Sequence, residues 1–131
     1  MGPTFLGLDE VLEIHRDQIE RYGGALGVRD RGLFESALAM PRAGSQGVYF
    51  HADVHEMAAA YLYHIVQNHP FVDGNKRVGT MAAYVFLRLN GLDLTASNPE
   101  IVELVLGVAE GRVGKAAVAA FFRGHAVDRP S

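Results

Sequence analysis

The sequence contains no cysteine, which excludes a disulfide framework, a thiolate zinc site and a cysteine nucleophile. Lysine is scarce, since Lys76 and Lys115 are the only two beside ten arginines. No run of basic residues is present and the net charge is −3, which argues against binding of DNA or RNA. No apolar stretch approaches the ~20 residues of a membrane span, and residues 1–4 do not begin a signal peptide. We therefore expect a cytoplasmic protein that binds neither membrane nor nucleic acid.

The length and composition are those of one globular domain. A chain of 131 residues can bury roughly two thirds of the surface that it exposes when unfolded. Hydrophobic residues make up 49% and charged residues 21%, which is ordinary for a folded protein. We expect a single domain over residues 1–131.

Apolar residues recur at helical spacing along nearly the whole chain, which predicts an all-α fold. Glycines, prolines and N-capping residues divide the pattern into about six helices. The expected helices cover residues 8–22, 31–40, 54–68, 75–90, 98–110 and 115–123. Residues 42–52 form the longest irregular stretch, in which residues 48–50 could be a strand or one arm of a hairpin.

Residues 69–77, with the sequence HPFVDGNKR, gather polar side chains between two apolar helices. They lead into the start of a helix, where unpaired backbone N–H groups and the helix dipole favour an anion such as a phosphate. Gly74 would let the backbone approach a ligand, and Asn75 could cap the helix or donate to a phosphate oxygen. Lys76 adds a point charge and Arg77 a planar, bidentate donor.

Two further residues of this segment carry reactive groups. Asp73 is its only carboxylate, and Mg²⁺ is commonly held by one or two carboxylates together with substrate phosphates. Histidine is a common general base in proteins, and His69 is the natural candidate to take the proton of a hydroxyl. Taken singly, each residue could also be a turn, cap or surface residue; together they indicate phosphoryl or nucleotidyl transfer. We expect Phe71 to anchor the loop in the core.

The same nine residues match the motif H-x-F-x-[DE]-G-N-[GK]-R of Fic proteins at every position. Similarity extends to LDEVL at residues 8–12, GLFESAL at residues 32–38 and FLRLNG at residues 86–91, and covers most of the chain. The sequence resembles the death-on-curing (Doc) toxins of the Fic/Doc family, which are the toxin half of bacterial toxin–antitoxin pairs. The resemblance implies a compact Fic/Doc-like helical bundle, in which the loop or hairpin near residues 42–52 is a flap that docks a target protein.

The resemblance also implies a role for each residue of the motif. His69 would deprotonate a hydroxyl of the target protein. Asp73 would hold Mg²⁺ on the phosphates of ATP. The nucleotide phosphates would be bound by the turn that follows, formed by Gly74, Asn75, Lys76 and Arg77.

Two departures from the AMP-transferring Fic proteins bear on the reaction. Those proteins usually have glycine in place of Lys76 and a second arginine in place of Thr80. The Doc branch shares the lysine, and the resemblance implies a serine/threonine protein kinase that transfers the γ-phosphate of ATP to a translation elongation factor and arrests translation. Transfer of AMP to a protein hydroxyl and a non-catalytic, antitoxin-binding module remain alternatives. Hydrolysis of a phosphoester is disfavoured, because the segment has one carboxylate only.

Self-inhibited Fic proteins often carry the motif [ST]-x-x-x-E-[GN], which this sequence lacks. We therefore expect inhibition by a separate antitoxin chain acting in trans. Among the other histidines, His51 and His55 have a spacing that could hold a metal, but a helix start explains that stretch equally well, and we expect no metal there. We expect His64 in the core and His15 at the surface or at a helix cap.

Overall fold

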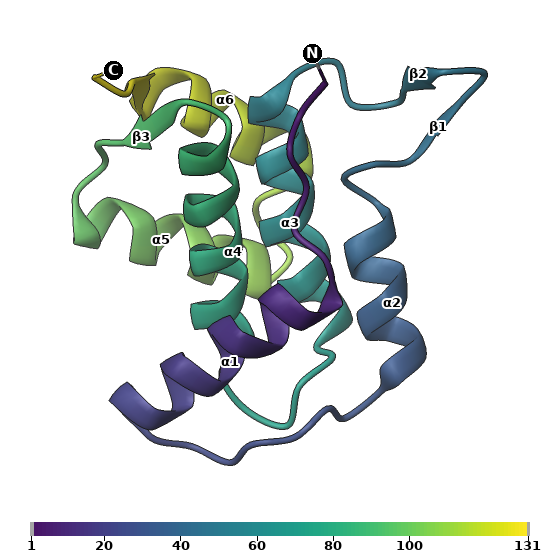
Figure 1. Cartoon of the computed structure of the whole chain (residues 1–131). Helices are drawn as coiled ribbons and strands as arrows, with labels where there is room; N and C mark the ends of the chain where they lie inside the picture. Colours follow the sequence, from purple (N-terminus) through teal and green to yellow (C-terminus); the bar gives the residue numbers. More distant parts are fainter. Residues whose placement is uncertain (1, 131) are drawn as a thin grey trace.

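The computed structural model describes residues 2–130, which form six α-helices and two small antiparallel sheets (Figure 1). The helices are α1 (Leu8–Tyr22), α2 (Arg31–Ala39), α3 (Val54–Asn68), α4 (Asn75–Leu89), α5 (Asn98–Ala109) and α6 (Lys115–His125). The strands are β1 (Gly44–Ser45), β2 (Val48–Tyr49), β3 (Leu92–Leu94) and β4 (Ala126–Asp128). The predicted all-α bundle with a hairpin near residues 42–52 is confirmed.

Helices α3 and α4 lie side by side at the centre of the fold, with α2, α6 and α1 around them (Figure 1). Residues 57–62 of α3 are all buried, as expected for a helix that is apolar on most sides. Gly79 allows the close approach of the two helices. A Cβ at this position would lie 3.0 Å from Cγ2 of Val66 and 3.2 Å from the carbonyl oxygen of Leu62. The loop between α3 and α4 is therefore held by a tightly packed helix pair.

Side-chain caps set the starts of α2, α3 and α5. The carboxylate of Asp53 accepts a hydrogen bond from the N–H of Glu56 at 2.9 Å, and α3 begins at Val54, the residue after Asp53. Asp30 caps α2 in the same way, and Ser97 forms a capping box at α5. The bounds predicted from the sequence for residues 8–22 and 54–68 are confirmed, and the other helices begin or end within two residues of their expected bounds.

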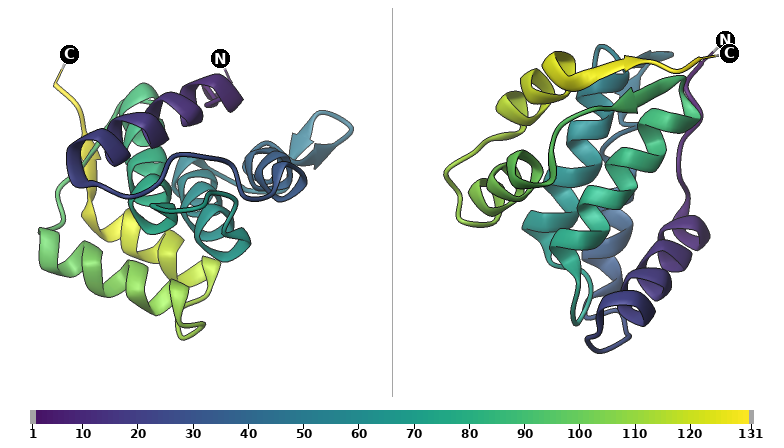
Figure 2. Two further views of the ribbon diagram at one scale, coloured as in Figure 1. Left: turned by 90° about the horizontal axis from the view of Figure 1, so that it is seen from below. Right: turned by 90° about the vertical axis from the view of Figure 1, so that its left-hand side faces the viewer.

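Strands β3 and β4 were not expected from the sequence. They pair antiparallel, with Leu94 opposite Ala126, and join the segment after α4 to the segment after α6. Each has only three residues, too few for an alternating pattern to be recognised. Beside them, both amide functions of Asn90 bond the backbone of Thr4 at 2.8 and 2.9 Å, and the N–H of Arg129 donates to the carbonyl of Gly91. Both ends of the described chain thus lie near the end of α4 (Figure 2).

The core is rich in aromatic side chains. Phe34 packs against Phe71 with ring centroids 5.0 Å apart, and Tyr61 against Phe86 at 5.1 Å. All four are fully buried, so the expectation that Phe71 anchors its loop in the core is confirmed.

Across residues 2–130, no helix has both the length and the apolar character needed to cross a membrane.

Candidate active site

The nine-residue segment forms the C-cap of α3, a short loop and the start of α4. α3 ends at Asn68, and its C-cap residue His69 has the left-handed backbone conformation with φ 50°. Phe71 then makes an isolated antiparallel bridge with Val28, so that the loop runs beside the segment between α1 and α2. Gly74, with φ 84°, is the N-terminal cap residue of α4. This left-handed conformation explains why the sequence has glycine here.

Hydrogen bonds fix the backbone of His69, and the residue is exposed to solvent. Its N–H donates to the carbonyl of Ile65 at 3.2 Å, and its own carbonyl accepts a hydrogen bond from Nε of Arg29 at 2.7 Å. The guanidinium of Arg29 also donates to the carbonyl of Asn68 at 3.1 Å. The imidazole is therefore presented to solvent from a fixed backbone, where a hydroxyl substrate could reach it.

Asp73 is exposed and faces the segment after α1. One carboxylate oxygen accepts a hydrogen bond from the N–H of Ala25 at 2.8 Å. Within residues 2–130, no cluster of three or more histidine and carboxylate side chains that could enclose a metal is present. A single exposed carboxylate nevertheless fits Mg²⁺, which keeps several waters and is commonly bound by one carboxylate together with phosphates. The site suits a metal that arrives with a nucleotide.

The side chain of Asn75 is buried and bonded to the loop. Its Oδ1 accepts from the N–H of Phe71 at 2.9 Å, and its Nδ2 donates to the carbonyl of Phe71 at 3.0 Å. Of the two roles considered for Asn75, capping of the helix does not occur, because Gly74 occupies the cap position; binding of a phosphate stays a prediction. Since the side chain of Asn75 is buried and holds Phe71, the group that Asn75 can offer to a phosphate is its backbone N–H, which has no acceptor within the helix.

We expect the substitution Asn75→Ala to lower the free energy of unfolding by about 3 kcal/mol, because it leaves two buried backbone groups of Phe71 unpaired at about 1–3 kcal/mol each. Urea denaturation measures this. Asn90→Ala is the matched control, since Asn90 bonds the backbone of Thr4 through the same two atoms at a more exposed site. Equal losses in the two variants would contradict the buried role of Asn75.

Lys76 and Arg77 occupy the first turn of α4. Lys76 is exposed. The guanidinium of Arg77 donates to the carbonyls of Gln18 and Gly23 at 3.1 and 3.0 Å and lies over the ring of Tyr22. These two bonds fix α4 to the end of α1 and use two of the five N–H donors of an arginine. The predicted binding of a phosphate by Gly74, Lys76 and Arg77 stays a prediction, and the geometry allows it.

His15 is a member of the site that the sequence did not predict. It was expected at the surface or at a cap, but it is buried in α1 with its ring stacked 4.1 Å from that of Phe71. Its Nε2 lies 3.0 Å from the carbonyl oxygen of Asp73, and because a carbonyl only accepts, this nitrogen carries the proton. Burial lowers the pKa of His15 and keeps the ring neutral. The spacing of Val11, His15 and Ile19 on one face of α1 is the signal that could have found it.

The sequence model of the Fic/DOC family matches residues 5–87, which include α1 to α3, the whole loop and all but the last two residues of α4. The chain belongs to the Fic/DOC family. It is 45% identical over 75 residues to Toxin Doc of Mycolicibacterium smegmatis, a match that covers 57% of this chain and 58% of that protein. It is 35% identical over 112 residues to Protein kinase doc of Escherichia phage P1, covering 85% and 86% of the two chains.

A groove of about 660 Å³ opens beside the Fic/DOC motif, between α1, α4 and α5. Lys76, Arg77 and Thr80 belong to its polar part, whereas Tyr22 and Val102 are among the exposed apolar side chains that line it. Its volume lies within the range of about 300–1,000 Å³ that is usual for small-molecule sites. The cationic first turn of α4 therefore continues directly into a largely apolar groove.

Proposed function

We propose that this Fic/DOC protein is the toxin of a toxin–antitoxin pair and that it transfers the γ-phosphate of ATP to a hydroxyl side chain of a translation elongation factor. The observation that carries this proposal is the loop between α3 and α4, which joins an exposed imidazole, an exposed carboxylate and a cationic helix start within nine residues. The names of the two relatives, Toxin Doc and Protein kinase doc, support a toxin and a transferase of the Fic/DOC type.

His69 is the proposed general base. Its imidazole takes the proton of the target hydroxyl, and the oxygen attacks the γ-phosphorus while the bond from that phosphorus to the β–γ bridging oxygen breaks. The products are a phosphorylated protein and ADP. Most of the rate enhancement then comes from positioning and from stabilisation of the phosphate charge.

The start of α4 is the proposed phosphate site. Gly74 brings the backbone close to the ligand, and the N–H groups of the first turn, Lys76 and Arg77 face the negative charge. Asp73 would hold Mg²⁺, which when bound neutralises part of the phosphate charge. ATP and Mg²⁺ are thus the proposed substrate and cofactor.

Thr80 favours phosphate transfer over AMP transfer. It stands where AMP-transferring Fic proteins usually have a second arginine. Its Oγ1 donates to the carbonyl of Lys76 at 2.8 Å, so its hydroxyl is bonded within α4. A second cationic contact to a diphosphate is missing at this position, whereas Lys76 adds a charge one turn earlier. A nucleotide would therefore be bound in a different orientation.

The β1–β2 hairpin is the proposed docking element for the target. Its second arm carries Val48, Tyr49 and Phe50, all exposed, and the hairpin stands away from the helices (Figure 1). An exposed strand edge with apolar side chains can pair with an extended segment of another protein. The target hydroxyl would lie on such a segment.

A separate antitoxin chain is the proposed inhibitor. The groove between α1, α4 and α5 presents exposed apolar side chains such as Tyr22, Val102 and Leu106, and it ends at Lys76 and Arg77. A partner segment that covered the apolar part would also reach the proposed phosphate site. Inhibition would then follow from occupation of one continuous surface.

The mass of a purified bacterial elongation factor, measured after incubation with this protein, ATP and Mg²⁺, tests the proposed reaction. We expect the gain of one phosphate, and its loss in Asp73→Asn with little change in Tm, because Asp73 is exposed and makes one hydrogen bond through its carboxylate. The gain of one AMP would show that Lys76 and Thr80 do not redirect the nucleotide. If the protein arrests growth when it is expressed in cells but adds no mass to the elongation factor in this assay, the choice of target is wrong.

A further inference from the structure

His15 is a buried histidine of α1 that contacts the loop of residues 69–77 from its inner side. Only 3% of the residue is exposed. Its ring stacks on that of Phe71 with centroids 4.1 Å apart, and a Cβ at Gly74 would lie 3.8 Å from its Cδ2. A ring at this depth contributes packing, and its hydrogen bond shows that it contributes more.

The backbone carbonyl of Asp73 is bonded by His15. Nε2 of His15 donates to this oxygen at 3.0 Å, and no other hydrogen bond to it occurs among residues 2–130. An apolar ring in the same place could stack on Phe71 but would leave the carbonyl without a partner. The polar atom of His15 therefore acts on the backbone of the loop.

This hydrogen bond fixes the orientation of the peptide unit between Asp73 and Gly74. The unit is planar and trans, so its C=O and N–H point in opposite directions. Because the carbonyl points to α1, the N–H of Gly74 points away from α1, and it donates to no backbone carbonyl of the described chain. The N–H of Gly74 is thus available on the side of the loop opposite to His15.

The backbone conformations at the start of α4 bring this N–H together with the next ones. Gly74 is left-handed, with φ 84° and ψ 14°, and Asn75 is the first residue of the right-handed helix. Successive N–H groups of neighbouring left- and right-handed residues form a nest, which is a concave binding site for anions. The nest at the proposed phosphate site is formed by the N–H groups of Gly74, Asn75 and Lys76, and His15 sets the first of them.

We propose that His15 is a positioning residue of the transfer reaction, whose Nε2–H orients the Asp73–Gly74 peptide so that the N–H of Gly74 faces the nucleotide phosphates. The inference rests on the proposed function, because it assigns a role within the same phosphate site. His15 itself touches neither nucleotide nor target and transfers no proton. Its loss weakens the binding of Mg²⁺·ATP and leaves the step performed by His69 unchanged.

Three exchanges of His15 separate the hydrogen bond from the packing. The side-chain nitrogen of glutamine is as many bonds from Cα as Nε2 of histidine, so His15→Gln keeps the donor without the ring. His15→Asn has the same amide group one bond closer to the backbone, and its nitrogen falls short of the carbonyl. His15→Phe keeps the stacked ring without the donor. A packing role predicts that His15→Phe is affected least, whereas a positioning role predicts this of His15→Gln.

The dissociation constant of Mg²⁺·ATP, measured by calorimetry on the full chain without target protein, is the first measurement. We expect it to rise about tenfold in His15→Phe and His15→Asn, as for the loss of one hydrogen bond, and to stay within about threefold of the wild type in His15→Gln. In the transfer assay the KM for ATP should rise in the same order, with kcat little changed.

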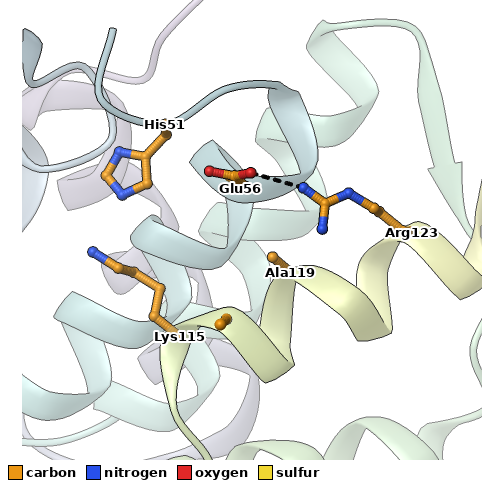
Figure 3. Close-up of a pocket in the computed structure, with 6 residues that line it drawn as sticks. His51, Glu56, Lys115, Ala119 and Arg123 are labelled. Carbon is orange, nitrogen blue, oxygen red and sulfur yellow. Dashed lines mark hydrogen bonds and ion pairs between the residues drawn. The ribbon is translucent and has the colours of Figure 1, made fainter.

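His51→Phe is the matched control. His51 is 9% exposed and lines a separate pocket between α3 and α6, beside Glu56 and Lys115 (Figure 3). Its Nδ1 has no hydrogen-bond partner among the described residues, and no residue lining this pocket belongs to the segment 69–77. The same exchange of a buried imidazole for a phenyl ring should therefore leave the affinity for Mg²⁺·ATP unchanged.

The order parameter of the Gly74 N–H, from ¹⁵N relaxation of the free protein, is a second measurement that needs no nucleotide. We expect a rigid N–H, with an order parameter near about 0.85, in the wild type and in His15→Gln, and a lower value in His15→Phe and His15→Asn. If His15→Phe does not fold, the comparison of His15→Gln with His15→Asn decides the matter.

Wild-type affinity in His15→Phe and His15→Asn, or equal losses in His15→Gln and His15→Asn, would overturn the role of His15. A wild type that binds no Mg²⁺·ATP would instead count against the proposed function. The order parameter of Gly74 would then still show whether His15 holds this peptide, and equal values in all variants would show that it does not.

Discussion

Replacement of His69 by asparagine is expected to lower the rate of transfer by about 10²–10⁴-fold, the usual contribution of a general base, and so to relieve growth arrest. The structure holds His69 through its backbone, and its imidazole is exposed. Asparagine tolerates the left-handed conformation at φ 50° better than alanine does. The fold should therefore survive, and the loss should be one of chemistry.

Growth after induced expression and the Tm of the purified protein are the two measurements. His125→Asn is the matched control, because it makes the same exchange at the end of α6, outside the loop between α3 and α4. We expect the control to arrest growth as the wild type does. Growth arrest by His69→Asn at the wild-type level would exclude His69 as the general base.

Phe71→Ala is expected to lower the free energy of unfolding by about 3–5 kcal/mol, the usual cost of removing a buried phenyl ring. The ring of Phe71 is fully buried between those of His15 and Phe34, at centroid distances of 4.1 and 5.0 Å. Its removal leaves a cavity under the loop that carries Asp73. Since small domains are stable by only about 5–15 kcal/mol, the variant would be close to unfolding.

Urea denaturation of the two single variants Phe71→Ala and Val72→Ala measures this effect. Val72 is the next residue along the chain and is 48% exposed, so its truncation should change the stability by no more than about 0.5 kcal/mol. Phe71→Leu, which keeps most of the apolar contact, should fall between the two. Similar stabilities for Phe71→Ala and Val72→Ala would show that the loop does not depend on this anchor.

Much of the fold follows from local sequence. α1 and α3 could be predicted to the residue, because apolar spacing and caps or glycines act over a few residues. The β3–β4 pair could not, because it joins segments more than 30 residues apart through strands of three residues. Pairing at such a distance is decided by the packing of α4 and α6, which no local pattern reports.

The candidate site, like the fold, could be predicted from the sequence only in part. The motif gives the residue types, but their orientations depend on contacts from α1 and the segment after it. The side chain of Asn75 turns inward to Phe71, and His15 reaches the carbonyl of Asp73 from 58 residues away. Ala25 and Arg29 bind the loop from a glycine-containing stretch without periodicity. A sequence motif alone does not show which side chains hold the loop and which remain available to a substrate.

The contacts that fix Thr4 and Arg129 beside the end of α4 have a practical consequence for labelling. Both residues bond the turn at residues 90 and 91, whereas the proposed phosphate site lies at the first residue of α4, about 22 Å away along a 15-residue helix. Fluorophores or affinity tags fused at either end would therefore stay clear of the loop that carries His69.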